Sequence, residues 1–248
     1  MKKLGKIIGI LILIIGVLVL VGYLTFNEKR PPVSASPEAD SLAVKMLNAV
    51  NKRAWDSTHI VTWNFKGGHT YVWDKKSNFV SITWEDYEAL LNLQTWKKGR
   101  ALKGKQEIKG AELDVIRGKA WKYFCNDSFW LIAPFKVFDE GTSRSLVKNA
   151  VGTNDLLVSY SSGGVTPGDA YLWKIDKNGL PQSYKMWVSI IPIGGVEATW
   201  ENWIKQPSGA LIATNHQLGP LNIPILSLKT GETLEEIGLS KDLFDKIR

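Results

Sequence analysis

Apolar and polar residues alternate along most of the segment from Ser159 to Trp203. The alternation is clearest over 170–175 and 184–190, and it resumes over 196–200. Successive side chains of a β-strand point to opposite faces, so a period of two predicts strands with one buried face. Turns rich in Gly and Pro separate the runs, because Gly readily takes positive φ and Pro presets φ. The segment is therefore predicted to form three or four strands joined by tight turns.

Three shorter runs with the same alternation lie between residues 60 and 84. Val61, Trp63 and Phe65 share one face of the first run, and a Gly-Gly turn separates it from the second. Strands joined by such short turns build an antiparallel sheet with one apolar face. Strands are predicted at 60–66, 69–74 and 80–84, and further ones at 90–93, 101–108, 156–160, 209–215 and 221–228.

Three segments change from a period of two to helical spacing. Residues 37–53 follow Ser36, and a serine followed by a proline is typical of the N-cap and first position of a helix. Residues 110–125 form a second helical pattern that Asn126 and Asp127 are expected to end, and a short third helix is expected after Ser240. An amphipathic helix must bury its apolar stripe, so these helices are expected to lie over one face of the sheet.

Residues 129–138 are the most apolar stretch outside the N-terminus, and they include Trp130 and Phe135. Pro134 argues against a central strand, because proline has no backbone N–H to donate to a neighbouring strand. A loop this apolar is either tucked into the core or closes over an apolar ligand. The sequence is consistent with both interpretations.

The N-terminus determines the expected location. Three lysines, the last at Lys6, precede an uncharged apolar run from Ile7 to Leu24. A bilayer-spanning helix needs about 17–25 residues, whereas the apolar part of a secretory signal has roughly 7–15. The positive-inside rule places the rest of the chain across the membrane. The expectation is a single-pass protein of the bacterial inner membrane with its C-terminal domain in the periplasm or outside the cell; a cleaved signal is the alternative.

This interpretation divides the chain into three parts. They are an N-terminal membrane anchor (1–26), a Pro- and Ser-rich tether (27–36) and an exported β-rich domain (37–248).

Composition is compatible with one large core and gives no sign of a nucleic-acid partner. The chain has 248 residues, 44% of them hydrophobic, which suffices for a single substantial core. The net charge of +7 becomes +4 without Lys2, Lys3 and Lys6, since 28 basic and 24 acidic residues then remain. Proteins that bind nucleic acid usually carry a concentrated basic stripe, and no dense run of Lys and Arg follows the N-terminus.

No motif for catalysis, a metal or a cofactor stands out. The single cysteine, Cys125, excludes an intrachain disulfide. The three histidines lack the short spacings typical of metal sites, so they are interpreted as isolated polar or surface residues. Glu197 and Glu201 share a face of one predicted strand and are placed to flank a glycan, although charges on a solvated strand face explain them as well. No catalytic residue, metal or cofactor is predicted.

The aromatic faces of the strands are the strongest candidate for a binding site. A long twisted antiparallel sheet curls, and one or two helices are not expected to fill its hollow. An apolar ligand cavity and a packed core are then equally good interpretations. The residues predicted to line the cavity are Trp63, Phe65, Tyr71, Trp73, Trp84, Trp130, Phe135, Tyr171, Trp173, Met186 and Trp200.

The order of these elements resembles the LolA/LolB-like lipoprotein-carrier superfamily. The resemblance rests on the stretches 61–65 (VTWNF), 71–74 (YVWD) and 168–176 (GDAYLWKID) and covers about residues 37–228. It implies an α+β fold: a curved antiparallel sheet, or half-barrel, of roughly nine or more strands with amphipathic helices over one face. In this chain an N-terminal transmembrane helix would precede that fold, which departs from carriers that shuttle freely.

Such families carry lipids or acyl chains. The expected function is therefore membrane-tethered, non-enzymatic binding of an apolar ligand, a lipid, an acyl chain or a lipoprotein, on the exported side of the membrane, without a nucleic-acid partner. Two alternatives remain at this stage: a glycan-binding or glycan-processing domain of the cell envelope, and a structural scaffold of an envelope complex.

Overall fold

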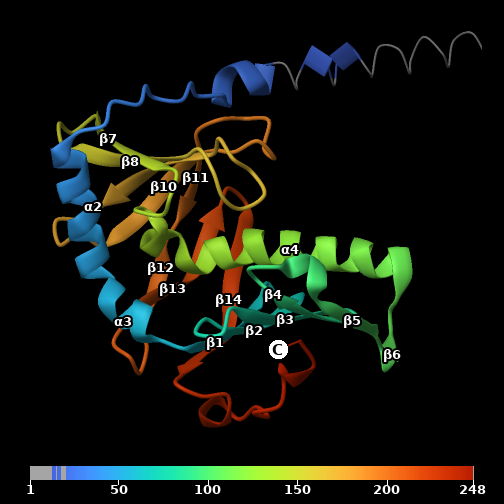
Figure 1. Cartoon of the computed structure of the whole chain (residues 1–248). Helices are drawn as coiled ribbons and strands as arrows, with labels where there is room; N and C mark the ends of the chain where they lie inside the picture. The colour runs from blue at the N-terminus through green and yellow to red at the C-terminus, as the bar shows by residue number, and fades with distance from the viewer. Residues whose placement is uncertain (1–12, 15, 18–20, 248) are drawn as a thin grey trace, which may run out of the picture.

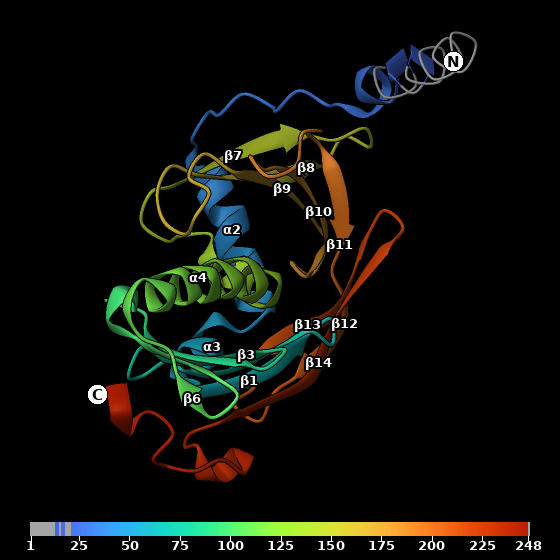
Figure 2. The ribbon, with the colours of Figure 1, turned by 90° about the vertical axis from the view of Figure 1, so that its right-hand side faces the viewer.

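The computed structural model describes residues 13–14, 16–17 and 21–247. Fourteen strands form one antiparallel sheet in the order β6-β5-β4-β3-β2-β1-β14-β13-β11-β10-β9-β8-β7, with β12 paired to β13 beside this path (Figure 1). The expected α+β fold with a large, curved, open antiparallel sheet is confirmed. Figure 2 shows the sheet bending like the letter C around the helices α2 and α4.

The first half of the sheet is a meander in which each strand pairs with the next. Its strands are β1 (Ile60–Phe65), β2 (His69–Asp74), β3 (Phe79–Trp84), β4 (Tyr87–Asn92), β5 (Arg100–Lys103) and β6 (Gln106–Glu107). Lys66 and Gly67 both have positive φ in the β1–β2 turn, at 53° and 76°. A glycine at the second of these positions avoids the strain that a Cβ would cause.

The second half contains the longer strands. They are β7 (Thr142–Lys148), β8 (Asn154–Tyr160), β9 (Ala170–Ile175), β10 (Pro181–Trp187), β11 (Val196–Thr199), β12 (Glu201–Lys205), β13 (Leu211–Leu218) and β14 (Leu221–Gly231). Strand β14 pairs with both β13 and β1 and so joins the two halves. Strand β7 was not predicted. It is an edge strand with one buried residue, Ser145, and lacks the apolar alternation that reveals the others.

The sheet bends where β11 passes into β12. Strand β11 pairs with β10 and meets β13 only through Ala198 and Leu218. After Trp200 the chain continues as β12, which pairs with β13 alone. Asn202, the second residue of β12, has a φ of 52°. Glu197 and Glu201 were predicted to lie on one strand, but the chain passes from β11 to β12 between them.

The predicted helix over 37–53 is present as two pieces. Helix α2 (Pro37–Ala49) begins at Ser36, whose Oγ accepts a hydrogen bond from the Ala39 amide at 3.2 Å. Helix α3 (Lys52–Ser57) follows a break at Asn51, which has a φ of 56° and caps α3 through its side chain. Asparagine tolerates this left-handed conformation better than most residues, so the interruption occurs there.

Helix α4 (Gly110–Ile132) runs past the point where it was predicted to end. Asn126 and Asp127 do not terminate it, because tertiary partners satisfy the Asp127 side chain. The apolar stretch 129–138, predicted as a loop, is the end of α4 followed by the 3₁₀ helix η2 (Ala133–Lys136). Both Trp130 and Phe135 are buried, so this stretch belongs to the core.

The C-terminal segment packs on the outer face of the first half of the sheet. A regular helix was expected after Ser240, but the described residues there form one short 3₁₀ helix, η4 (Asp245–Ile247), while η3 (Glu235–Ile237) lies before Ser240. Phe244 is fully buried, and its ring lies 5.7 Å from that of Phe79 on β3. The outer face of the sheet therefore also has apolar packing, in addition to its inner face.

Most of the predicted membrane anchor lies outside the described residues. Among the residues that the structure describes, no helix has the length and apolar character needed to cross a bilayer. The tether is ordered against the domain: the Glu28 amide donates to the Gly194 carbonyl at 3.0 Å, and the Trp187 indole donates to the Glu28 carbonyl at 2.8 Å. A Cβ at Gly194 would come within 2.7 Å of that same carbonyl, so glycine is needed for this close approach.

Candidate functional site

The eleven residues predicted from the sequence meet in one buried cluster. Ten of them are at most 9% exposed, and Trp73 is half-buried against the same cluster. They come from both halves of the sheet, from α4 and from η2. The bend of the sheet therefore joins aromatic faces that are separate in sequence into a single interior, here called the aromatic interior.

In the first half of the sheet, strand register stacks the rings. Trp63 on β1 lies opposite Tyr71 on β2, and their rings are 4.5 Å apart and nearly parallel. Phe124 of α4 packs against both of them and makes an edge contact with Trp73 at 5.3 Å. Helix α4 therefore lies in the hollow of the sheet. It occupies space that was predicted from the sequence to be available for a ligand.

In the second half, five rings from different elements pack together. Trp173 on β9 lies opposite Tyr184 on β10, with ring centroids 4.9 Å apart. Trp200, at the break between β11 and β12, lies 5.2 Å from Trp173 and 4.4 Å from His216 on β13. Trp130, near the end of α4, covers His216 at 5.4 Å. Aromatic contacts of this kind stabilise by about 0.5–1.5 kcal/mol each beyond area burial.

Several indole nitrogens in this interior have no hydrogen-bond partner. Buried polar atoms in native proteins almost always have one, so each exception needs an explanation. The unpartnered N–H groups, counted over the described residues, belong to Trp63, Trp73, Trp84, Trp173 and Trp200. They line the same interior that the sequence indicated.

A buried carboxylate anchors α4 to the sheet. Asp127, 2% exposed, accepts hydrogen bonds from the Tyr71 hydroxyl at 2.6 Å and from His69 Nδ1 at 2.6 Å. Burial, reinforced by this carboxylate, raises the pKa of Tyr71 above its ordinary value, so the phenol remains a donor. Tyr123 stacks on the His69 ring at 4.0 Å. His69 was interpreted as an isolated polar residue, and this interpretation is wrong.

Asp127 was missed because it resembles a residue that ends a helix. The signal that identifies it is its position in the buried stripe of α4, in step with Ile116, Ala120, Phe124 and Leu131. A carboxylate within such a stripe requires a buried partner. Because that partner comes from a distant strand, only the tertiary structure shows it.

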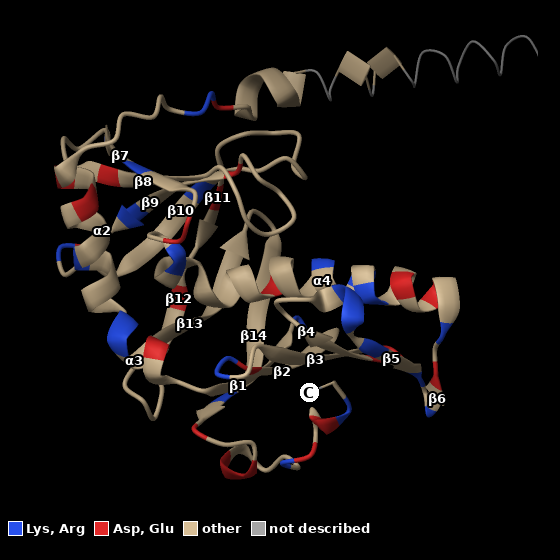
Figure 3. Cartoon of the chain, in the orientation of Figure 1, with Lys and Arg blue, Asp and Glu red and all other residues tan. Residues whose placement is uncertain are grey.

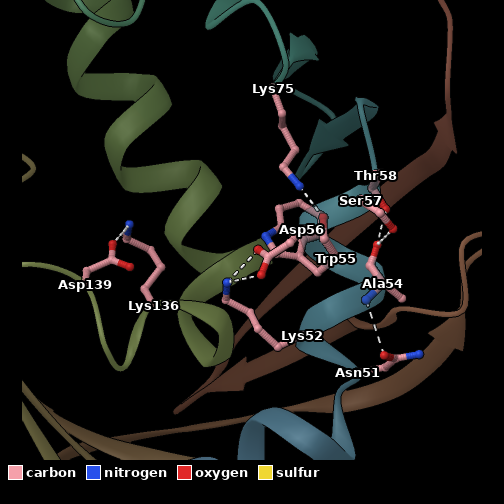
Figure 4. A network of polar contacts seen from close by, with 10 residues as sticks. All are labelled: Asn51, Lys52, Ala54, Trp55, Asp56, Ser57, Thr58, Lys75, Lys136 and Asp139. Atoms are coloured by element: carbon pink, nitrogen blue, oxygen red, sulfur yellow. Dashed lines mark hydrogen bonds and ion pairs between the residues drawn. The ribbon is translucent and has the colours of Figure 1, made fainter.

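A polar network closes the interior near α3 (Figure 4). The Trp55 ring stacks on Phe135 at 4.9 Å, and Lys75 Nζ lies 3.7 Å above the same ring while donating to the Trp55 carbonyl. Burial lowers the pKa of Lys75 to about 8. Lys52 and Asp56 form an ion pair on the exposed side of α3. These contacts hold η2 and α3 together over one end of the aromatic interior.

Glu197 and Glu201 are not brought together as a pair. They lie on separate strands, β11 and β12. Glu197 accepts from Lys174 at 2.8 Å and from Ser183 at 2.6 Å, and Glu201 accepts from Asn215 at 3.2 Å. Each carboxylate therefore has a structural partner of its own. Among the described residues no group of His, Cys, Asp and Glu is arranged to hold a metal ion.

A groove of about 620 Å³ lies outside the aromatic interior, between the sheet and the C-terminal segment. Its walls include Gln206, Leu228, Thr230 and Ile237, and a second groove of about 370 Å³ adjoins it. None of the eleven predicted residues lines either groove.

Burial of His216 makes stability depend on pH. Burial lowers its pKa to about 4, so the unfolded chain, with a histidine pKa of about 6.5, binds the proton first. We expect the free energy of unfolding to fall by about 2 kcal/mol between roughly pH 6.5 and pH 5 from this residue. Urea unfolding of the His216→Gln variant should lack this part of the slope, whereas His59→Gln should retain it. Identical slopes for wild type and His216→Gln would contradict the assignment.

Comparison with known proteins shows a structural likeness. No family model matches the sequence, and no curated protein matches it. The crystal structure of a DUF1329 family protein from Desulfovibrio piger ATCC 29098 aligns with 84% of this chain and 95% of its own length. The TM-score is 0.41 and the sequence identity 12%.

Proposed function

We propose that this chain is a membrane-tethered, non-enzymatic protein that binds an apolar ligand, a lipid or acyl chain, in the aromatic interior between the curved sheet and α4. The observation that carries the proposal is the continuous aromatic lining, contributed by both halves of an open sheet. The role corresponds to that of LolA/LolB-like carriers. The expected site is the exported side of a bacterial membrane.

The N-terminal half of α4 is the proposed cover of the site. Within residues 110–119, Ile116 is the one residue classed as buried, and Val115 is 68% exposed. Figure 3 shows charged positions gathered along this half of the helix. A segment with few buried contacts separates from its neighbours at low free-energy cost. Exposing the rings of Trp84 and Trp63 would also require the next turn of the helix to move, because Tyr123 and Phe124 contact these rings.

The ordered tether favours a function close to the membrane. Lys185 pairs with Glu28 at 2.5 Å, and Arg30 donates to the Gly168 carbonyl at 3.0 Å. With residues 27–30 fixed on the sheet, the domain would sit directly beside the point where the predicted anchor ends. Ligand exchange with the membrane itself then requires no diffusion through the periplasm.

A photo-cross-linking experiment tests the proposal. The full chain in nanodiscs is irradiated with a fatty acid that carries a diazirine on its acyl chain, and the modified peptides are mapped by mass spectrometry. We expect cross-links on peptides of β1, β9 and α4 in addition to any on residues 1–26. An excess of unlabelled fatty acid should suppress the first set selectively. Cross-links confined to residues 1–26 would overturn the proposal, because lipid would then surround only the anchor.

A further inference from the structure

Almost all of the net positive charge of the chain lies in one segment. Residues 97–122 contain nine of the 31 basic residues but only three of the 24 acidic ones, a net charge of +6. The rest of the chain has 22 basic and 21 acidic residues, so its charges nearly balance. The nine are spread over the 3₁₀ helix η1 (Trp96–Lys98), β5, β6 and the first half of α4. These elements meet at one end of the domain, here called the basic end, where Figure 3 shows blue positions on β5 and along α4.

The two arginines of the basic end are occupied within the protein. Arg100 pairs with Glu107 at 2.7 Å, and Arg117 pairs with Asp114. Arg117 also donates to the Gly99 carbonyl at 3.1 Å, which fastens α4 beside η1. Two of the three carboxylates of the segment are therefore neutralised by arginine and do not offset the lysines.

The third carboxylate, Glu112, is one of the groups around Lys103. A hydrogen bond with Tyr87 and the carboxylates of Asp86 and Glu112 raise the pKa of Lys103, so the protein itself already stabilises this cation. In the described part of the chain, six other lysines of the basic end have no ion-pair partner: Lys97, Lys98, Lys105, Lys109, Lys119 and Lys122.

Apolar side chains lie among these lysines. Val115, Lys119 and Lys122 are about one and two turns apart and share a face of α4. Val115 on this face is 68% exposed. Beside the helix, the rings of Trp96 and Trp121 stack nearly parallel at 5.9 Å, and both are half-buried. The basic end therefore combines unpaired ammonium groups with accessible apolar and indole groups.

This chemistry favours a broad anionic surface over a single bound anion. A site for one phosphate or carboxylate typically uses the bidentate fork of an arginine, but both arginines here are occupied, and neither groove described above includes a residue of the basic end. Lysines on long flexible stems act as separate point charges, which suits a layer of many phosphates. Basic residues interspersed with exposed apolar and aromatic groups are typical of surfaces that bind anionic lipid bilayers.

We infer that the basic end is a docking surface for an anionic lipid bilayer. The six lysines attract the phosphate groups of the lipids, and Val115 enters the interfacial layer. This attachment is additional to the predicted N-terminal anchor, and it does not depend on ligand binding in the aromatic interior. Because the attraction is electrostatic and the lysines are exposed to solvent, salt should weaken it.

The test places a fluorescent probe on the basic end of the full chain. Cys125 is changed to serine and Val115 to cysteine, and quenching of the attached probe by neutral acrylamide is measured in nanodiscs. We expect the quenching constant to be about threefold lower with mixed phosphatidylglycerol and phosphatidylcholine than with phosphatidylcholine alone. The difference should disappear at about 1 M salt, where the Debye length is about 3 Å. A probe at Val151→Cys, a site 82% exposed on the β7–β8 turn, is the matched control and should respond to neither change.

Charge reversal identifies the lysines that act. Lys98→Glu combined with Lys122→Glu should abolish the effect of phosphatidylglycerol on the Val115 probe. Lys148→Glu combined with Lys177→Glu makes the same change of net charge at exposed positions away from the basic end, and it should retain the effect.

Equal quenching of the Val115 probe in the two kinds of nanodisc would overturn the inference, and so would equal losses in the two double variants. Shielding by soluble polyphosphate without shielding by phosphatidylglycerol would also overturn it, because the partner would then be a soluble polyanion. If a double variant fails to fold, the lipid and salt comparison on the otherwise unchanged chain still decides. Cross-linking in the aromatic interior is measured separately, so failure of docking leaves the proposed function intact.

Discussion

Trp173→Ala is expected to lower the free energy of unfolding by about 3–5 kcal/mol, the usual cost of removing a buried tryptophan. The side chain is fully buried and contacts Tyr184 and Trp200 at 4.9 and 5.2 Å. Its removal deletes transfer free energy and leaves a cavity between β9, β10 and the β11–β12 break. The measurement is urea unfolding followed by far-UV circular dichroism, which does not depend on the lost fluorophore.

Trp203→Ala is the control for this prediction. Trp203 lies in the same region, with its ring 6.1 Å from that of Trp200, but it is only half-buried. Its removal should cost clearly less than that of Trp173. Equal losses for the two variants, or a loss below about 1 kcal/mol for Trp173→Ala, would show that the interior is not packed as described.

Asp127→Ala has the second largest expected effect, also about 3–5 kcal/mol, because it removes one member of a buried charged network. The variant leaves the Tyr71 hydroxyl, and the His69 ring nitrogen, without their acceptor beneath α4. Asp127→Asn should cost less, since an amide oxygen still accepts from Tyr71. A double-mutant cycle with Tyr71→Phe measures the coupling between helix and sheet.

Asp114→Ala gives the matched comparison on the same helix. Asp114 pairs with Arg117, but its side chain is 72% exposed, and exposed ion pairs contribute at most about 1 kcal/mol. A small loss for Asp114→Ala beside a large one for Asp127→Ala would establish that burial of the network, and not charge on α4 as such, stabilises the helix on the sheet. Losses of similar size would contradict this view.

Strands were predictable where one face is buried and the other solvated. The turn after Phe65 and the strand from His69 to Asp74 could be located to within a residue, because alternation and Gly-Gly both identify them. Prediction failed where that contrast is weak. Strand β7 lies at an edge with polar residues on both faces, and the C-terminal segment carries a helical pattern that becomes short turns held by Phe244.

The candidate site was also predictable from the sequence only in part. The sequence indicated which aromatic residues turn inward, and all eleven lie in or against one core. It did not show that α4 lies in the hollow, because the predicted stop at Asn126 and Asp127 shortened the helix. The sheet partners of Asp127, Tyr71 and His69, are at least 56 residues away in the chain. A local sequence pattern cannot indicate a contact between residues so far apart in the chain.

By itself, the sequence determined the elements whose formation depends on neighbouring residues: most strands, the starts of the helices and the inward aromatic faces. The tertiary structure alone decided the bend at Trp200, the closure of β14 on β1, the burial of Asp127 and the unpaired indole groups of Trp173 and Trp200. The physical reason is that hydrophobic periodicity is a local property of the chain. Whether a polar atom finds a partner depends instead on which distant segments pack against it.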